Sequence, residues 1–104
     1  MKISVVIPTY NSSAFIHATL NSVLCQTRQP DEILILDDIS ADDTISILNS
    51  YKPRFTVFRK NHQGVVSARN SLCERAQGDL VAFLDADDIW HPNYLEVQCN
   101  NFKD

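Results

Sequence analysis

Four short apolar runs alternate with segments of helical periodicity along this chain. Each run is mostly apolar and too short for a helix, so we expect each to form a buried strand. The predicted strands are residues 3–7, 32–36, 55–58 and 80–84. Apolar residues at helical spacing follow them, most clearly Ile16, Leu20 and Val23. This alternation predicts an α/β fold with a mainly parallel sheet and helices on both faces.

Local signals predict where the helices begin and end. Ser12 or Ser13 can cap a first helix. Residues 40–43 resemble a capping box that opens a short second helix. Gly78 stands where the C-terminal glycine of a third helix is expected, and Pro92 suits the first turn of a last helix.

Composition limits the classes of protein to consider. The chain has 104 residues, which is one domain at most, and 44% of them are hydrophobic, enough for a packed core. A net charge of −4 argues against nucleic acid as a partner. The longest apolar run is far shorter than a membrane span. Three separated cysteines without a C-x-x-C pair indicate reduced thiols in a cytoplasmic protein, with membrane association left open for a longer form.

Three acidic residues follow the last predicted strand directly. Asp85, Asp87 and Asp88 place carboxylates within four positions at the end of a buried strand. Such carboxylates repel one another unless a cation lies among them, and Mg²⁺ is often held by one or two carboxylates plus substrate phosphates. A solvated acidic turn that caps the next helix is the alternative. The stretch alone leaves both interpretations open.

Polar clusters end three of the predicted strands. They are Thr9-Tyr10-Asn11, Asp37-Asp38 and the acidic cluster after residue 84. Pro8 cannot donate to a sheet ladder, so we expect the first strand to end at about this residue. In a parallel sheet these clusters share one rim, and ligands bind outside the carboxyl ends of the strands. The sequence therefore predicts a binding crevice at that rim.

Four motifs, in this order and spacing, resemble the nucleotide-binding half of family 2 glycosyltransferases of GT-A fold. They are VVIPTYN, LILDDIS, HQGVVSARN and VAFLDADDIWHP. The resemblance extends over nearly the whole chain. It implies a Rossmann-like fold and an enzyme that transfers a sugar from a nucleotide-diphosphate donor, with a UDP-sugar expected. The acceptor, whether glycan, lipid or protein, is left open.

The resemblance implies a metal site in the last motif. Asp85 and Asp87 occupy the D-x-D positions that hold Mn²⁺ or Mg²⁺ on the donor diphosphate, with Ala86 between them at the nucleotide-sugar. Asp87 is expected to be the more direct ligand. A metal on the diphosphate stabilises the charge that develops as the sugar departs.

The first two motifs imply a site for the nucleotide base. Pro8, Thr9 and Tyr10 resemble the segment that lines the base, and the Tyr10 ring offers a face for stacking. Packing of Tyr10 over the sheet edge is the alternative. Asp38, with Asp37 beside it, resembles the carboxylate that accepts a hydrogen bond from the base; an Asx turn is the alternative.

Two further features bear on the same site. The family often has glycine after the Asp pair, whereas this chain has Ile39, so we expect the turn to differ locally. Gly64 and Arg69 fall in the segment that approaches the nucleotide in the family. Arg69 suits base or phosphate oxygens, or else a surface salt bridge.

The resemblance also implies that some functional residues of the family lie outside the four motifs. The general base and the acceptor site belong to the later half of the domain, so residues 1–104 are expected to be an incomplete, donor-binding portion. An exposed sheet edge would then allow a homodimer. A nucleotide-binding module without turnover and a receiver-like Mg²⁺-binding signalling domain are the alternatives. A nucleotidyltransferase is disfavoured, because Gly64 and Gly78 are the only glycines.

Overall fold

A computed structural model describes residues 1–51, 53–61 and 64–102. Within these residues strands and helices alternate as the sequence predicts. The strands are β1 (Ile3–Thr9), β2 (Glu32–Asp37), β3 (Thr56–Arg59) and β4 (Leu80–Phe83). The helices are α1 (Ile16–Leu24), α2 (Thr44–Ser50), α3 (Val65–Arg75) and α4 (Tyr94–Asn101).

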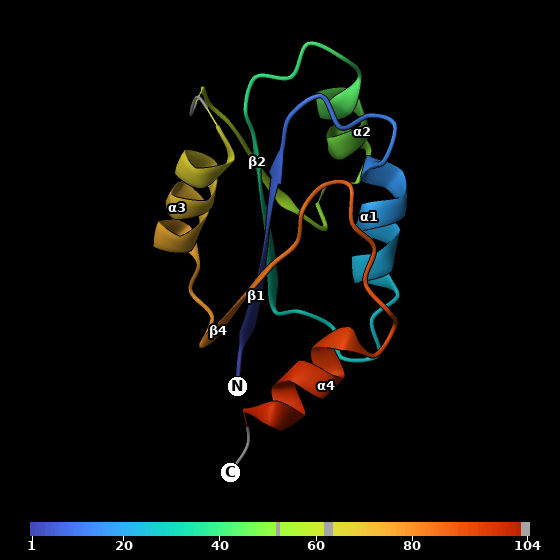
Figure 1. The fold of residues 1–104 in the computed structure, drawn as a ribbon, viewed down its shortest axis with the longest axis vertical. Helices are drawn as coiled ribbons and strands as arrows, with labels where there is room; N and C mark the ends of the chain where they lie inside the picture. The colour runs from blue at the N-terminus through green and yellow to red at the C-terminus, as the bar shows by residue number, and fades with distance from the viewer. Residues whose placement is uncertain (52, 62–63, 103–104) are drawn as a thin grey trace.

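The strands form one sheet in the order β3-β2-β1-β4, and every neighbouring pair is parallel. Figure 1 shows α3 on one side of the sheet and α1 and α2 on the other. The predicted α/β architecture is therefore confirmed. Every helix in the described ranges falls short of the length and apolar character that a membrane crossing requires.

Alternate residues of β1 face two separate cores. Ile3, Val5 and Ile7 point into the core shared with α1, α2 and α4, whereas Val6 points into the core under α3. This period of two follows from strand geometry. It explains why the run is apolar on both faces apart from Ser4: a central parallel strand buries both faces.

The prediction of a strand buried on both faces is wrong for β4. This strand lies at an edge of the sheet and pairs with β1. Its first three residues are half-buried, and Phe83 keeps 46% of its surface exposed. An apolar run therefore does not distinguish a central strand from an edge strand.

β1 ends close to its predicted end at about Pro8, and continues one residue further, to Thr9. The Thr9 carbonyl points toward β2, where it accepts a hydrogen bond from the Asp38 amide. Backbone groups of successive residues in a strand point to opposite sides, so the nitrogen of Pro8 faces β4. There β4 pairs with β1 only as far as Val6 and Phe83. The N–H that proline lacks would lie beyond the paired stretch.

Three of the predicted helix starts differ from the structure. α1 begins at Ile16 without a side-chain cap, and the carbonyl rather than the hydroxyl of Ser12 accepts its first amides. α2 begins at Thr44, because the Ser40 side chain is bonded to Asp37 instead of capping. In both places the serine meets a partner outside its own helix. Pro92 lies two residues before α4, outside its first turn.

Gly78 is not the left-handed cap of α3. The helix ends at Ala76 in an extended conformation, and Gly78 lies in the turn into β4. A Cβ on Gly78 would stand 2.5 Å from Ser4 Oγ and 2.7 Å from Ser4 N. Glycine is therefore needed here for a close approach to β1.

Candidate functional site

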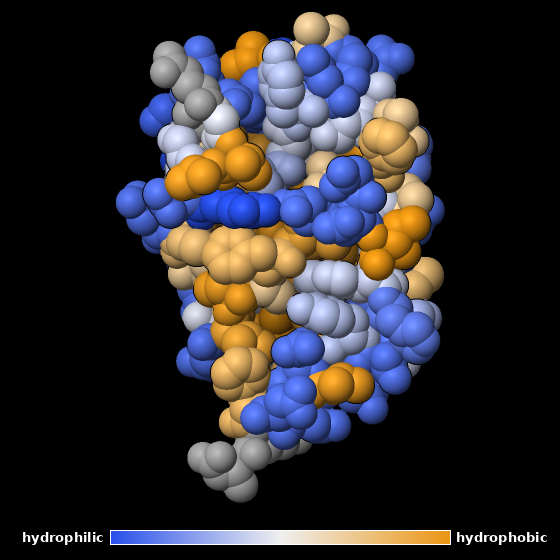
Figure 2. Space-filling view, in the orientation of Figure 1, coloured by the Kyte–Doolittle hydropathy of each residue, from blue (hydrophilic) through white to orange (hydrophobic). Residues whose placement is uncertain are grey.

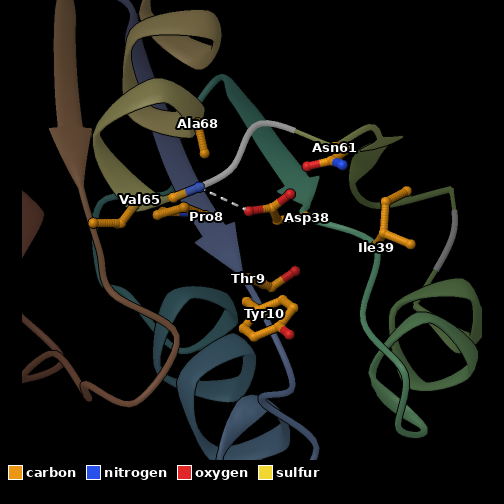
Figure 3. A pocket seen from close by; sticks show the side chains of 9 residues that line it. Pro8, Thr9, Tyr10, Asp38, Ile39, Asn61, Val65 and Ala68 are labelled. Atoms are coloured by element: carbon orange, nitrogen blue, oxygen red, sulfur yellow. Dashed lines mark hydrogen bonds between the residues drawn. The ribbon is translucent and has the colours of Figure 1, made fainter.

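Two adjoining cavities lie at the carboxyl ends of β1, β2 and β4. The first has a volume of about 630 Å³ and is shown in Figure 3. It is lined by Pro8, Thr9, Tyr10, Asp38, Ile39, Asn61, Gly64, Val65 and Ala68. The second, of about 420 Å³, is lined by Pro8, Tyr10, Asn11, Ser12, Phe15, Val65, Arg69, Asp85, Ala86 and Asp87. Pro8, Tyr10 and Val65 belong to both linings, so the two cavities share a wall.

The predicted crevice residues, apart from Asp37 and Asp88, line one or both of these cavities. Asn61 and Val65, which the sequence analysis did not assign to the site, line the first as well. Val65 is apolar yet 48% exposed at the start of α3. This exposure indicates a contact residue of the cavity, but it can be recognised only once the fold is known. His62 and Gln63 of the third motif lie outside the described residues.

The first cavity has one acidic group on a largely apolar wall. Figure 3 shows Asp38 facing the start of α3, where its carboxylate accepts a hydrogen bond from the Gly64 amide at 3.1 Å. Gly64 has a φ of 134°, a conformation that L side chains rarely adopt. Glycine therefore lets the backbone amide reach Asp38.

Ile39 corrects the expectation of a different turn. Its φ is 50°, so the β-branched residue occupies the positive-φ conformation that favours glycine. Two bonds hold the turn: the Ser40 amide and hydroxyl both donate to Asp37. The turn after the Asp pair is thus kept at some conformational cost.

Asp37 is fully buried and does not line either cavity. Its carboxylate accepts from the Thr9 hydroxyl and the Ser40 amide, both at 2.8 Å, and Arg59 Nε lies 3.7 Å away. A buried carboxylate with these partners is compensated for its lost hydration. Its place in the structure is therefore to hold β1 and the Asp38 turn together.

The loops after β1 and β2 are tied to one another at the rim. The Ser12 amide donates to Thr44 Oγ1 at 2.8 Å, and Ser13 donates to Asp42 through its amide and hydroxyl. Hydrogen bonds from the Thr44 side chain, and then from its amide and from Ser13, lower the pKa of Asp42 from 3.8 to about 2. These bonds join the loop after β1, which includes the cavity-lining Ser12, to the loop after β2.

The second cavity gathers the acidic cluster. Asp85, Asp87 and Asp88 offer carboxylate oxygens that all lie within 4.8 Å of one another. Arg69 Nη2 donates to Asp85 Oδ1, so a cation from α3 meets the cluster. The Arg69 Nε atom is buried and has no hydrogen-bond partner among the described residues. An all-oxygen donor set suits a hard divalent cation such as Mg²⁺ or Mn²⁺.

Comparison with known proteins identifies the family. The sequence profile of Glycosyl transferase family 2 matches residues 4–104. The chain is 42% identical over 100 residues to the putative teichuronic acid biosynthesis glycosyltransferase TuaG of Bacillus subtilis (strain 168), which covers 92% of this chain and 40% of TuaG. It is 42% identical over 90 residues to the UDP-Glc:alpha-D-GlcNAc-diphosphoundecaprenol beta-1,3-glucosyltransferase WfaP of Escherichia coli, which covers 85% of this chain and 36% of WfaP. The chain spans less than half the length of these relatives.

Two solved structures of similar fold contain nucleotides. S. aureus TarS 1–349 in complex with UDP-GlcNAc has a TM-score of 0.84 at 33% identity, over 96% of this chain and 30% of that one. Glucosyl-3-phosphoglycerate synthase of Mycobacterium tuberculosis, in complex with Mn²⁺, UDP and phosphoglyceric acid, has a TM-score of 0.72 at 30% identity, over 88% and 35%.

These likenesses confirm the predicted GT-A fold and set aside the receiver-like alternative. The profile matches nearly the whole chain, and sequence relatives and solved structures agree with it. The chain belongs to glycosyl transferase family 2.

Proposed function

We propose that this chain binds the nucleotide diphosphate of a sugar donor across the two cavities, as the donor-binding part of a glycosyltransferase. One observation carries the proposal: the cavity that contains Asp38 shares a wall with the cavity that contains Asp85 and Asp87. A base in the first cavity would thus direct its diphosphate toward the acidic cluster in the second.

The first cavity suits a pyrimidine base. Pro8, Val65 and Ala68 provide apolar contact, and the exposed Tyr10 ring stands at the mouth for stacking (Figure 3). A carboxylate has about four acceptor positions, so Asp38 can bond an imide N–H in addition to the Gly64 amide. This favours uracil, in keeping with the UDP-sugar and UDP of the relatives named above.

The second cavity suits a metal-bound diphosphate. Asp87 is the direct ligand in this proposal, because Asp85 is already paired with Arg69. When bound, Mn²⁺ or Mg²⁺ supplies Lewis-acid stabilisation of the departing diphosphate. Asp88 adds a third carboxylate beside it.

Arg69 has a second task in the proposal. Its guanidinium balances part of the acidic cluster, and its remaining N–H groups, including the buried Nε, are directed to donor oxygens. The salt bridge expected as an alternative does form, but it lies inside the proposed site rather than apart from it. The acceptor, which is a lipid diphosphate in the name of WfaP, and the general base are not assigned to any residue of this chain.

Calorimetry with UDP tests the proposal. We expect the wild-type chain to bind UDP more tightly in Mn²⁺ than in chelator. Asp87→Asn is expected to weaken UDP binding in Mn²⁺ by about 10–100-fold, as is typical for disturbed metal sites. Asp43→Asn is the control, since Asp43 is exposed and makes no side-chain cap bond at α2. Equal UDP affinity with metal and with chelator would contradict the proposal.

A further inference from the structure

The side of α1 that faces the loop after β4 carries buried polar side chains. Thr19 is 0% exposed, Ser22 9% and Gln26, just beyond the helix end, 4%. Residues three and four apart in a helix lie on one face, so these three form a row. Buried polar side chains require partners. Each of the three bonds a nearby carbonyl of α1 or its flank, and each also bonds backbone groups of one distant segment.

The row of α1 side chains bonds successive backbone groups of the segment 86–95. Thr19 Oγ1 lies 2.8 Å from the carbonyl oxygens of both Ala86 and Asp88. The Ser22 hydroxyl accepts from the Trp90 amide at 3.2 Å. The Gln26 amide group donates to the His91 carbonyl at 2.7 Å, and its oxygen accepts from the Leu95 amide at 2.9 Å.

These contacts replace regular secondary structure in the segment. Residues 84–93 form neither helix nor strand, and Figure 1 shows them running beside α1 between β4 and α4. Residues 84–93 include three carboxylates, those of Asp85, Asp87 and Asp88, whose oxygens lie within 4.8 Å of one another. Their mutual repulsion acts to push this part of the backbone apart. The α1 side chains oppose that spreading.

Thr19 bonds the backbone on either side of Asp87, the expected metal ligand. Ala86 and Asp88 flank Asp87, and their two carbonyls, each 2.8 Å from Thr19 Oγ1, share its single proton more closely than the Phe15 carbonyl at 3.3 Å. We propose that Thr19 is a positioning residue for metal binding: its hydroxyl fixes the backbone on both sides of Asp87 and so aims this carboxylate into the second cavity. The inference rests on the proposed function.

The test compares Thr19→Val, which keeps the shape and removes the hydroxyl, with Thr19→Ser, which keeps the hydroxyl. UDP titrations are run in Mn²⁺ and in chelator, with thermal melting of each variant. Thr19→Val is expected to weaken binding in Mn²⁺ by about tenfold and to leave binding in chelator unchanged, whereas Thr19→Ser stays near wild type. Should the valine variant not fold, Thr19→Ala against Thr19→Ser asks the same question.

A matched control separates positioning from general destabilisation. Ser4→Ala removes another fully buried hydroxyl, at the opposite end of β1, where it bonds the Gly78 amide at 2.8 Å. It is expected to lower the melting temperature without changing the effect of Mn²⁺. The inference is overturned if Thr19→Val keeps the full effect of Mn²⁺, or if Ser4→Ala loses it equally. If the wild-type chain itself shows no effect of Mn²⁺, the proposed function fails, and the inference with it.

Discussion

Ile39 carries backbone strain at the mouth of the first cavity. A β-branched residue at a φ of 50° is unfavourable, and such residues are often found at binding sites, held by surrounding bonds. Here the bonds from Ser40 to Asp37 fix the turn. The side chain, 46% exposed, lines the cavity. A strained backbone and a cavity-lining side chain therefore coincide in one residue.

Glycine and alanine at this position separate strain from packing. Both Ile39→Gly and Ile39→Ala remove the side chain, but only glycine relieves the left-handed backbone. Ile39→Gly is expected to be more stable than Ile39→Ala by about 1 kcal/mol. At ordinary positions the order is reversed, because glycine is more flexible when unfolded. Urea denaturation of the two variants measures the difference, and an alanine variant of equal or greater stability would refute the strained turn.

The loops after β1 and β2 show where sequence patterns were sufficient and where they were not. The alternation of strands and helices was predictable because it depends on local periodicity, and the polar strand ends were predictable from parallel topology. The starts of α1 and α2 were not, because the Ser12 hydroxyl bonds Tyr10 and the Ser40 hydroxyl bonds Asp37 instead of capping a helix. Neither the burial of Asp37 nor the contacts of Thr19 follows from any spacing within the chain.

The tie between these two loops should depend on pH. Hydrogen bonds to the Asp42 carboxylate lower its pKa from 3.8 to about 2 in the folded chain. A lowered folded-state pKa stabilises the fold above pH 3.8, and this contribution is lost as pH falls from 3.8 toward 2. We expect Asp42→Asn to melt below wild type at neutral pH and the gap to narrow across that range.

Thermal melting over a pH series measures the gap. Asp43→Asn serves as the control, because Asp43 is a neighbouring exposed carboxylate that makes no side-chain bond at the start of α2. A gap of constant size for Asp42→Asn down to pH 2 would show that the carboxylate bonds do not act as described.

The whole sheet places the crevice beside its central strand. The strand order is β3-β2-β1-β4. The chain passes from β1 to β2 and β3 in one direction across the sheet, and β4 is then added on the opposite edge, beside β1. Ligands bind at such a change of direction in open parallel sheets. The rim was predictable from the sequence, but the division into two cavities was not, since it depends on where α3 packs.

The β4 edge makes self-association expected for this chain in isolation. In the described residues β4 pairs with β1 on one side, and apolar side chains gather over it in Figure 2. Phe83 is 46% exposed there. An apolar strand edge is a template for a second copy, so we expect a concentration-dependent homodimer.

Phe83→Lys is expected to raise the dimer dissociation constant by more than about tenfold, since each of two copies loses roughly 1 kcal/mol of apolar burial. Val97→Lys is the matched control, because Val97 is 44% exposed but lies on α4. Sedimentation velocity over a range of concentrations distinguishes them. A chain that stays monomeric, or a dimer equally weakened by both variants, would rule out this edge.

The pairing of β1 with β4 also governs when the crevice can exist during synthesis. Ile3 pairs with Leu80, and both Leu80 and the acidic turn are synthesised long after β1. Such distant pairing is slow, and β1 must wait with one apolar edge uncovered. The crevice therefore forms only after β4 and the acidic turn have been synthesised, and a ligand of the crevice can assist maturation only from that point onward.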